Sequence, residues 1–306
     1  MRNLLRPKAV LPVAAALGLL IVLGSALAAR RAGLKLIELD PSYNHDRFVT
    51  KPVDIVRHFR AYTTSFDGDD DNDGDGAADR WAIPEWVAYE LRATPANLGR
   101  APRRPSSWIT DEDLHTQKIA PNDASYKHSD YSRGHMCMKS HAWRLGANAD
   151  WNTHTVLNAC PQKQTMNNGA WRALEELTGK WADTYGVVWI ICGPIIFNNT
   201  PSLWIGDQGE VPIAVLDAFF KIVVAESDTI GEPDVLAFIF PMKGDEHYGS
   251  RSPDRLLKPF LTSVDIIETL TGLDFLTDLD EETEQLTEEI VHTELWAYQA
   301  PPPPVP

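Results

Sequence analysis

Short apolar runs separated by turn-forming residues dominate the hydrophobic pattern of this chain. Five such runs have the length of a strand, and Gly, Pro, Asp or Ser residues stand between them: residues 84–91, 187–192, 211–216, 219–224 and 235–240. Apolar runs of this length, bounded in this way, predict buried β-strands. We expect the second strand to close at Gly193-Pro194, and a further strand-like alternation covers residues 51–63.

Helical spacing occurs in fewer places. The apolar side chains of residues 171–185 recur every three or four positions, which predicts an amphipathic helix. Residues 262–271 also resemble a helix, and Gly272 is expected to stop it. Residues 95–125 are rich in Pro, Arg, Asn and Asp and predict an irregular loop. This order of elements favours the α+β class, with a mixed central sheet and few flanking helices, over a helical bundle or a βαβ array.

The N-terminus has the layout of an export segment. Basic residues at positions 2, 6 and 8 precede an almost unbroken apolar run over residues 9–29, which ends in Ala26-Leu27-Ala28 and Ala29. This layout predicts a secretory signal peptide over residues 1–29. The run is about 20 residues long, enough to cross a bilayer, so an uncleaved membrane anchor is the alternative. Either way we expect the body outside the cytoplasm, as a secreted or periplasmic protein or held at the membrane.

The rest of the chain predicts one folded domain between two extended segments. A polar linker covers residues 30–50, the domain covers 51–296, and a proline-rich tail covers 297–306. Hydrophobic residues make up 43% of the 306 residues, which is enough for a core and excludes a chain disordered throughout. Three cysteines permit at most one intramolecular disulfide, and buried free thiols are the alternative.

Acidic residues are concentrated in two segments. The chain has 28 basic and 43 acidic residues, and its formal net charge of −15 by itself argues against a polyanionic partner. Residues 67–79 hold seven Asp and residues 263–294 hold eleven Asp plus Glu, and neither segment contains Lys or Arg. Outside them 25 acidic side chains stand against 28 basic ones, so the net charge does not exclude a substrate that carries phosphate.

Polar residues around position 135 carry the candidate chemistry. Arg133 and His135 flank a glycine, and Asn158, Asn167 and Asn168 follow. A neutral imidazole can take a proton from water, a carboxamide oxygen suits Mg²⁺, and a guanidinium can clamp a phosphate. Together these groups are the ones that one-metal hydrolysis of a phosphodiester requires.

Several ordered segments carry a family resemblance. At the centre are Ser132-Arg133-Gly134-His135, Leu157-Asn158-Ala159-Cys160-Pro161-Gln162-Lys163, Met166-Asn167-Asn168-Gly169-Ala170-Trp171 and Leu174-Glu175. Further out are Trp86-Val87-Ala88-Tyr89, Cys192-Gly193-Pro194, Phe219-Phe220-Lys221 and the stretch 263–273. The chain thereby resembles the DNA/RNA non-specific endonucleases over roughly residues 85–295. These are ββα-metal nucleases that include mitochondrial endonuclease G and secreted bacterial nucleases.

The resemblance implies a role for each site residue. His135 is expected to be the general base, Asn167 the sole direct protein ligand of a hydrated Mg²⁺, and Glu175 a carboxylate that orients metal-bound water. Asn158 is expected to position the site or the phosphate. Mn²⁺ would substitute for Mg²⁺, and DNA and RNA are the implied substrates, cut to leave 5′-phosphate ends.

Arginines are expected to contact the substrate. Arg133 belongs to the motif itself. A further arginine that contacts the transition state is expected in the preceding loop, and Arg104 is preferred to its neighbour Arg103 for this role. Arg103, Arg104 and Asn168 are predicted to bind substrate, and a solvated loop is the alternative for the arginine pair.

One position departs from the family pattern, because Ser132 stands where the family usually has Asp. Asp130, two residues earlier, is the candidate to replace it. The alternative to an active nuclease is therefore a catalytically weak nucleic-acid or calcium-dependent surface binding protein that retains the nuclease fold. A phosphodiesterase with another substrate is a third hypothesis. The resemblance leaves the preference between DNA and RNA, an inhibitor protein and the oligomeric state open.

A second metal site is predicted in the acidic stretch 67–82. Its carboxylates match the spacing of a Ca²⁺-binding loop, at Asp71, Asp73, Asp75 and Asp79. Ala82 stands at the position of the usual bidentate glutamate, and Glu85 lies three residues later. We expect a structural Ca²⁺ clip, with a solvated linker as the alternative.

Two other metal interpretations are weaker. A zinc cluster would use His128, His135, Cys137 and His141, whose spacing matches no familiar zinc pattern. The acidic run 278–289 is expected to form a solvated helix face and not a cation-binding tail.

Overall fold

The computed structural model describes residues 40–49, 54–68, 80–227, 229, 231–242 and 252–298. The predicted export segment 1–29, the Asp-rich stretch 69–79 and most of the predicted tail lie outside these residues. Within the described part of the chain, no helix is both long and apolar enough to cross a bilayer.

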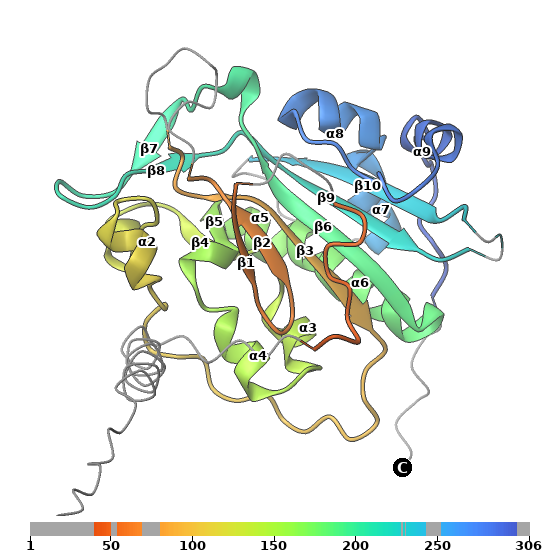
Figure 1. The fold of residues 1–306 in the computed structure, drawn as a ribbon, viewed down its shortest axis with the longest axis horizontal. Helices are drawn as coiled ribbons and strands as arrows, with labels where there is room; N and C mark the ends of the chain where they lie inside the picture. The colour runs from red at the N-terminus through yellow and green to blue at the C-terminus, as the bar shows by residue number, and fades with distance from the viewer. Residues whose placement is uncertain are drawn as a thin grey trace, which may run out of the picture.

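A seven-stranded sheet lies at the centre of the molecule (Figure 1). Its strands, in their order across the sheet, are β1 (Ile55–His58), β2 (Thr63–Phe66), β3 (Pro84–Arg92), β6 (Val187–Ile195), β9 (Ala218–Ala225), β10 (Asp234–Pro241) and β11 (Leu261–Thr262). Every ladder described in it is antiparallel, where the sequence analysis predicts a mixed sheet. Short connections such as the one between β9 and β10 allow only antiparallel pairing. The predicted α+β class is confirmed.

Two smaller ladders lie outside this sheet. Strand β4 (Ser132–His135) pairs with β5 (Ala159–Gln162), and β7 (Leu203–Ile205) pairs with β8 (Ile213–Val215). The predicted strand at 211–216 is therefore confirmed as β8, although it belongs to a separate hairpin.

The predicted strands of the central sheet are confirmed, with one correction. The runs at 84–91, 219–224 and 235–240 form β3, β9 and β10. The expected stop at Gly193-Pro194 is wrong, because β6 continues through both residues. Gly193 permits this, since a Cβ there would lie 2.3 Å from the backbone oxygen of Glu85. Pro194 is tolerated because the ladder with β3 ends at Cys192.

The helices are α2 (Glu112–Thr116), α3 (Lys139–Trp143), α4 (Ala147–Asn152), α5 (Gln164–Met166), α6 (Arg172–Tyr185), α7 (Pro253–Leu257), α8 (Val264–Thr271) and α9 (Glu281–Glu288). The predictions at 171–185 and 262–271 are confirmed as α6 and α8, and Gly272 ends α8 with a φ of 69°. The expected loop 95–125 also contains α2, which Asp111 caps by accepting from the Leu114 N–H.

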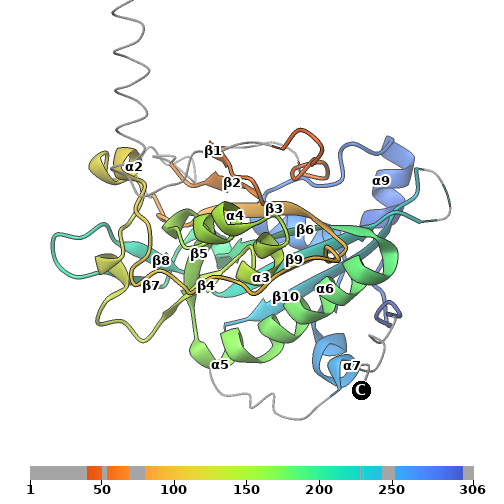
Figure 2. The ribbon, with the colours of Figure 1, turned by 90° about the horizontal axis from the view of Figure 1, so that it is seen from below.

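Alternate residues of the strands point to opposite faces of the sheet and build two cores. Leu174, Leu177 and Trp181 of α6 belong to one core, together with apolar residues of β3, β6 and β9. Val264 and Ile267 of α8 belong to the other. Figure 2 shows α6 and α7 on one side of the sheet and α9 on the other. The free thiols of all three cysteines, Cys137, Cys160 and Cys192, are buried, as the second of the two alternatives expects.

Candidate active site

His135 lies at the end of a two-stranded ladder that leads into a helix. In this ladder Ser132 lies opposite Gln162, and His135 lies opposite Ala159. Gly134 leaves no room for a side chain, because a Cβ there would lie 2.2 Å from Oε1 of Gln162. After β5, the short helix α5 and a kinked segment over Asn167–Trp171, in which Gly169 has non-helical backbone angles, lead directly into α6. Two strands and a helix thereby bring the end of β4 close to the start of α6.

Asn158 fixes the chain just after His135 from inside the core. Its Oδ1 accepts from the Cys137 N–H at 2.7 Å, and its Nδ2 donates to the carbonyls of Cys137 and Thr153, both at 3.0 Å. The side chain is fully buried and both ends of its amide are used. Of the two roles predicted for Asn158, these contacts fit positioning of the site and leave no atom for a phosphate.

The ring of His135 lies among aromatic neighbours and presents an unpartnered nitrogen. Its centroid is 4.7 Å from that of Trp108 and 5.2 Å from that of His154. Its Nε2 is buried and has no hydrogen-bond partner among the described residues. Desolvation lowers the pKa of His135 to about 3, and the charges of His154, Arg104 and Lys139 act in the same direction. The imidazole is therefore neutral at physiological pH, the state in which it can accept a proton.

Glu175 and Lys221 are buried side chains of opposite charge beside the same site. Glu175 lies in the first turn of α6 and is 5% exposed, and its Oε1 has no partner in the described part of the chain. Lys221 of β9 is fully buried, with its Nζ 3.8 Å from the ring centroid of Trp171. Burial raises the pKa of Glu175 to about 7, and the charge of Lys221 opposes this rise. A carboxyl that titrates near neutral pH is characteristic of functional sites.

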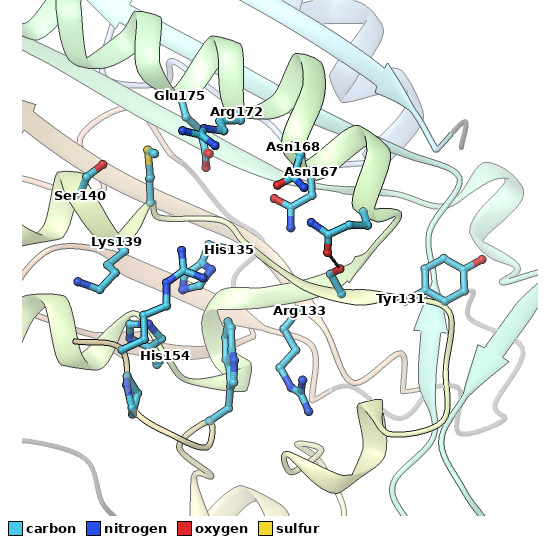
Figure 3. Close-up of a pocket in the computed structure, with 16 residues that line it drawn as sticks. Tyr131, Arg133, His135, Lys139, Ser140, His154, Asn167, Asn168, Arg172 and Glu175 are labelled. Atoms are coloured by element: carbon cyan, nitrogen blue, oxygen red, sulfur yellow. Dashed lines mark hydrogen bonds between the residues drawn. The ribbon is translucent and has the colours of Figure 1, made fainter. Parts of the chain in front are cut away.

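These residues line a pocket of about 640 Å³ (Figure 3). Six predicted site residues belong to its lining: Arg104, Arg133, His135, Asn167, Asn168 and Glu175. Two predicted residues do not, since Asn158 lies in the core and the exposed Arg103 lies outside the lining. The permanently basic side chains of the lining are Arg104, Arg133, Lys139 and Arg172, and its carboxylate is that of Glu175. The charged groups of the lining itself are therefore mostly cationic, which suits phosphate groups. Three of them also pair with carboxylates outside the lining: Arg133 with Asp123, Lys139 with Asp150 and Arg172 with Glu176.

The part of the pocket around Ser132, where the family usually has Asp, is polar. Ser132 lines the pocket and donates a hydrogen bond to Oε1 of Gln164. Asp130 is exposed and is not part of the lining, so it does not take the place of the missing carboxylate. Arg133 is anchored at its far end, with a guanidinium nitrogen 2.9 Å from the carboxylate of Asp123.

Sequence reasoning missed four charged or titratable neighbours of the site: Lys139, His154, Arg172 and Lys221. Arg172 has a readable signal, because it precedes Glu175 by three residues and so lies on the same helix face. Lys221 stands in a segment that carries the resemblance, but a buried lysine in an apolar strand shows no role until its neighbours are known. Lys139 and His154 come from separate elements that only the fold brings together.

The zinc hypothesis is wrong. His128 is exposed and its Nδ1 lies 2.7 Å from the Asp207 carboxylate. His141 is buried, with its Nδ1 3.2 Å from the hydroxyl oxygen of Tyr89. None of the residues of that hypothesis belongs to a group of potential metal ligands among the described residues.

The donors at the pocket fit a hydrated magnesium ion. Figure 3 shows the side chains of Asn167, Glu175 and His135 directed into the same cavity. Asn167 supplies an amide oxygen, and its backbone N–H donates to the Lys163 carbonyl at 2.9 Å, which fixes the start of the kinked segment. The unpartnered Oε1 of Glu175 is an oxygen acceptor, the kind of group that Mg²⁺ or its water prefers.

Comparisons with known proteins identify relatives of this chain. Residues 78–282 match the family described as DNA/RNA non-specific endonuclease. The mitochondrial nuclease EXOG of Danio rerio is 29% identical over 211 residues, which are 65% of this chain and 57% of that protein. A nuclease of Serratia marcescens is 27% identical over 237 residues, 72% of this chain and 74% of that protein.

A solved structure shows the same fold. A chain in the crystal structure of the EndoG/EndoGI complex matches with a TM-score of 0.62 at 23% identity, covering 76% of this chain and 90% of that chain. This match confirms the predicted ββα-metal nuclease fold.

Proposed function

Because the chain belongs to the DNA/RNA non-specific endonuclease family, we propose that it is an exported, Mg²⁺-dependent, sugar-non-specific endonuclease. It hydrolyses phosphodiester bonds of DNA and RNA and leaves 5′-phosphate ends. One observation carries the proposal: a neutral histidine lines a pocket rich in basic side chains, inside a strongly acidic protein.

His135 acts as the general base. Its neutral imidazole takes a proton from a water molecule, whose oxygen attacks the phosphorus, and the bond from phosphorus to the 3′ oxygen breaks. Trp171 holds the backbone of this residue, because its Nε1 donates to the His135 carbonyl at 3.3 Å. The low pKa of His135 keeps the base unprotonated before each turnover.

Basic side chains hold the scissile phosphate, and Asn167 and Glu175 provide the metal site. Arg104 and Arg133 line the pocket and provide hydrogen bonds and charge for phosphate oxygens. Asn167 would hold Mg²⁺ through its amide oxygen, and Glu175 would accept hydrogen bonds from the ion's water. When bound, Mg²⁺ or Mn²⁺ supplies neutralisation of the charge that develops on the phosphate and its leaving oxygen.

The test is cleavage of plasmid DNA and of RNA in MgCl₂ and in EDTA, by the wild type and by Asn167→Ala. We expect cleavage by the wild type in MgCl₂ alone, and a loss of roughly 10–100-fold in Asn167→Ala that higher Mg²⁺ partly restores. Binding without cleavage by the wild type would instead support the surface binding protein. A folded Asn167→Ala protein with normal activity would refute the metal assignment.

The proposal includes a structural Ca²⁺ clip in the Asp-rich loop, whose ligands Asp71, Asp73, Asp75 and Asp79 lie outside the described residues. Contacts at the two ends of the loop support it. The Trp81 N–H donates to the Asp67 carboxylate, and the Arg80 Nε donates to the Gly68 carbonyl at 3.1 Å. These bonds hold residues 67–68 and 80–81, which flank the Asp-rich stretch, close to one another. Millimolar Ca²⁺ should raise the melting temperature, and Asp73→Ala with Asp75→Ala should remove this part of the rise.

Export rests on residues 1–29, and fractionation of cells that produce the full chain tests it. A protein recovered in the medium or periplasm without these residues would support a cleaved signal, whereas recovery of the full chain with membranes would support the anchor.

A further inference from the structure

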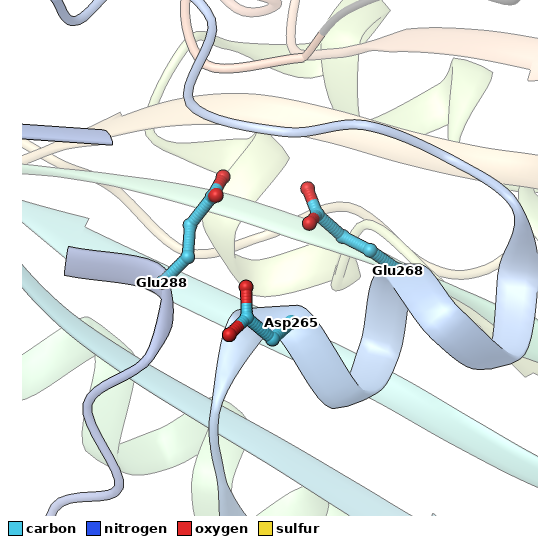
Figure 4. A group of neighbouring side chains, drawn as sticks. All are labelled: Asp265, Glu268 and Glu288. Carbon is cyan, nitrogen blue, oxygen red and sulfur yellow. The ribbon is translucent and has the colours of Figure 1, made fainter. Parts of the chain in front are cut away.

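Three carboxylates converge between α8 and α9, on the face of the sheet opposite α6. Asp265 and Glu268 lie on α8, and Glu288 lies at the end of α9. Each offers an oxygen, and these oxygens lie within 4.8 Å of one another (Figure 4). A second group consists of Asp274, Glu284 and Glu288, whose oxygens also lie within 4.8 Å of one another. Glu288 therefore belongs to both groups. We call these five residues the α8–α9 acidic cluster.

Glu288 is buried within the cluster, where it shares a hydrogen bond with Glu268 and its charged neighbours are carboxylates. Glu288 is 7% exposed, and its Oε1 is buried with no hydrogen-bond partner among the described residues. The expectation of a solvated helix face for 278–289 is confirmed for Asp278, Asp280, Glu281, Glu282 and Glu289, which are exposed. It fails at Glu288, because the last turn of α9 packs toward α8. Residues 263–294 contain no Lys or Arg, so the segment supplies no permanent cation of its own. Ionising several neighbouring carboxylates is costly where they are partly buried and no cation lies among them, and a bound cation offsets that cost.

We propose that the α8–α9 acidic cluster is a divalent-cation site that takes Ca²⁺. Calcium accepts six to eight oxygen ligands in flexible geometry, and carboxylates from two helices can bind it in one- or two-oxygen modes. Mg²⁺ requires a tighter octahedron and keeps its water, so it suits this wide arrangement less. The site would tie α9 to α8, and it is separate from the proposed catalytic pocket.

The local structure already holds part of the cluster in place. Oε1 of Glu268 accepts a hydrogen bond from the Phe275 N–H at 2.7 Å, which fixes the turn after α8. Asp280 caps α9 by accepting from the Thr283 N–H at 3.2 Å. Glu288, the most buried of the proposed ligands, lies outside the residues 78–282 that match the family.

The carboxylates of the cluster repel one another. Burial, followed by the charges of Glu268, Glu284, Asp265 and Asp274, raises the pKa of Glu288 to about 8. The pKa of Glu268 is also raised, by burial and by the carboxylates of Asp274 and Asp265. A bound cation would offset the repulsion among these carboxylates.

The experiment is a calorimetric titration of the full chain with CaCl₂ at pH 7. Asp73→Ala, Asp75→Ala and Asn167→Ala form the background, because they remove the two other proposed metal sites. In this background we expect one saturable site. Glu288→Gln should weaken the affinity at least tenfold, whereas Glu282→Gln should change it less than about twofold. Glu282 is exposed on the same helix, so this control makes the same change of charge.

A second variant and a second measurement keep the proposal open to refutation. Glu268→Gln should weaken binding as Glu288→Gln does, and Ca²⁺ should raise the melting temperature of the background but not of either variant. Equal Ca²⁺ responses in Glu288→Gln and Glu282→Gln would overturn the site. No saturable binding in the background would also overturn it, and would leave the cluster as a pair of glutamates that share a proton.

Discussion

Glu175 and Glu288 are buried glutamates on opposite faces of one sheet, and their surroundings differ in sign. Each is at most 7% exposed, each has an unpartnered oxygen among the described residues, and burial raises the pKa of both, to about 7 and about 8. Lys221 and Arg172 lower the pKa of Glu175, whereas four further carboxylates raise that of Glu288. Equal burial therefore gives two different sites. The pocket around Glu175 can take both a cation and a phosphate, and the α8–α9 acidic cluster can take only a cation.

This difference also explains why the net charge of the chain misleads. The net charge of −15 comes from the two acidic segments, and one of these forms the α8–α9 acidic cluster on the face of the sheet opposite the pocket. The basic residues that line the pocket come from a loop, a strand and two helices, namely Arg104, Arg133, Lys139 and Arg172. The field at a site depends on these few side chains and much less on the sum over the chain.

The largest effect should come from His135→Ala, which removes the proposed base from the pocket. We expect a loss of activity on the order of 10²–10⁴, measured as initial rates of plasmid cleavage, with the melting temperature little changed. His128→Ala is the matched control, because His128 is exposed and outside the pocket lining. Glu288→Gln should leave the rate unchanged, and a folded His135→Ala protein with near-normal rates would remove the mechanism.

Arg104→Ala and Arg103→Ala form the next comparison, between adjacent arginines of the same loop. Only Arg104 lines the pocket, so its loss should lower the rate about 10–100-fold, while the loss of Arg103 should cost less than about threefold. Rates on short oligonucleotides separate this effect from loose binding to long DNA. Equal losses in both variants would mean that the pair contributes only general charge.

Lys221→Met removes a buried cation beside Glu175. The charges around Glu175 then become more like those around Glu288, which has only carboxylates among its charged neighbours. The pKa of Glu175 should then rise, since Lys221 lowers it in the wild type. If Glu175 acts as a carboxylate, the acid limb of the rate against pH moves to higher pH, and the rate at pH 7 falls roughly threefold to tenfold. Lys180→Met, on the same helix as Glu175, is the control. An unchanged pH profile in a folded Lys221→Met protein would show that Glu175 does not need to ionise.

The sequence could predict the strands and the motif residues because both are local. Periodicity identifies β3, β9, β10 and α6, and ordered motif spacings identify His135, Asn167 and Glu175. Gly193 and Pro194 are misleading because punctuating residues usually end a strand, whereas here close approach to the Glu85 backbone requires the glycine. That requirement is a tertiary property and has no signal in the local sequence.

The remaining parts of both sites depend on packing between distant segments. Lys221 reaches Trp171 across 50 positions of the chain, and Glu288 meets Asp265 through the turn that joins α8 and α9. A charge run on a helix usually indicates a solvated face, and only the packing of the last turn of α9 shows that Glu288 is buried.

A smaller effect should appear in stability against pH, and it separates the two glutamates without a metal. The folded-state pKa of Glu288 is raised, so its contribution to stability is present below about pH 4.5 and is lost as the pH rises to about 8. In EDTA, the melting temperature of the wild type should fall about 2–4 °C more than that of Glu288→Gln between pH 5 and 8. Glu282→Gln should follow the wild type. Parallel curves for all three proteins would mean that Glu288 is solvated.

The smallest effect should come from Ser132→Asp, which adds the carboxylate that the family usually has. Ser132 lines the pocket and donates to Oε1 of Gln164, so an aspartate there requires the Gln164 amide to turn and present its nitrogen. The new charge would strengthen attraction for Mg²⁺ and weaken it for phosphate, and these effects partly cancel. We therefore expect only a twofold to fivefold change in rate, with half-maximal activity at lower Mg²⁺. Ser132→Asn is the neutral control of similar size. If both variants lower the rate equally and the Mg²⁺ requirement does not move, the hydrogen bond to Gln164 matters here and the missing charge does not.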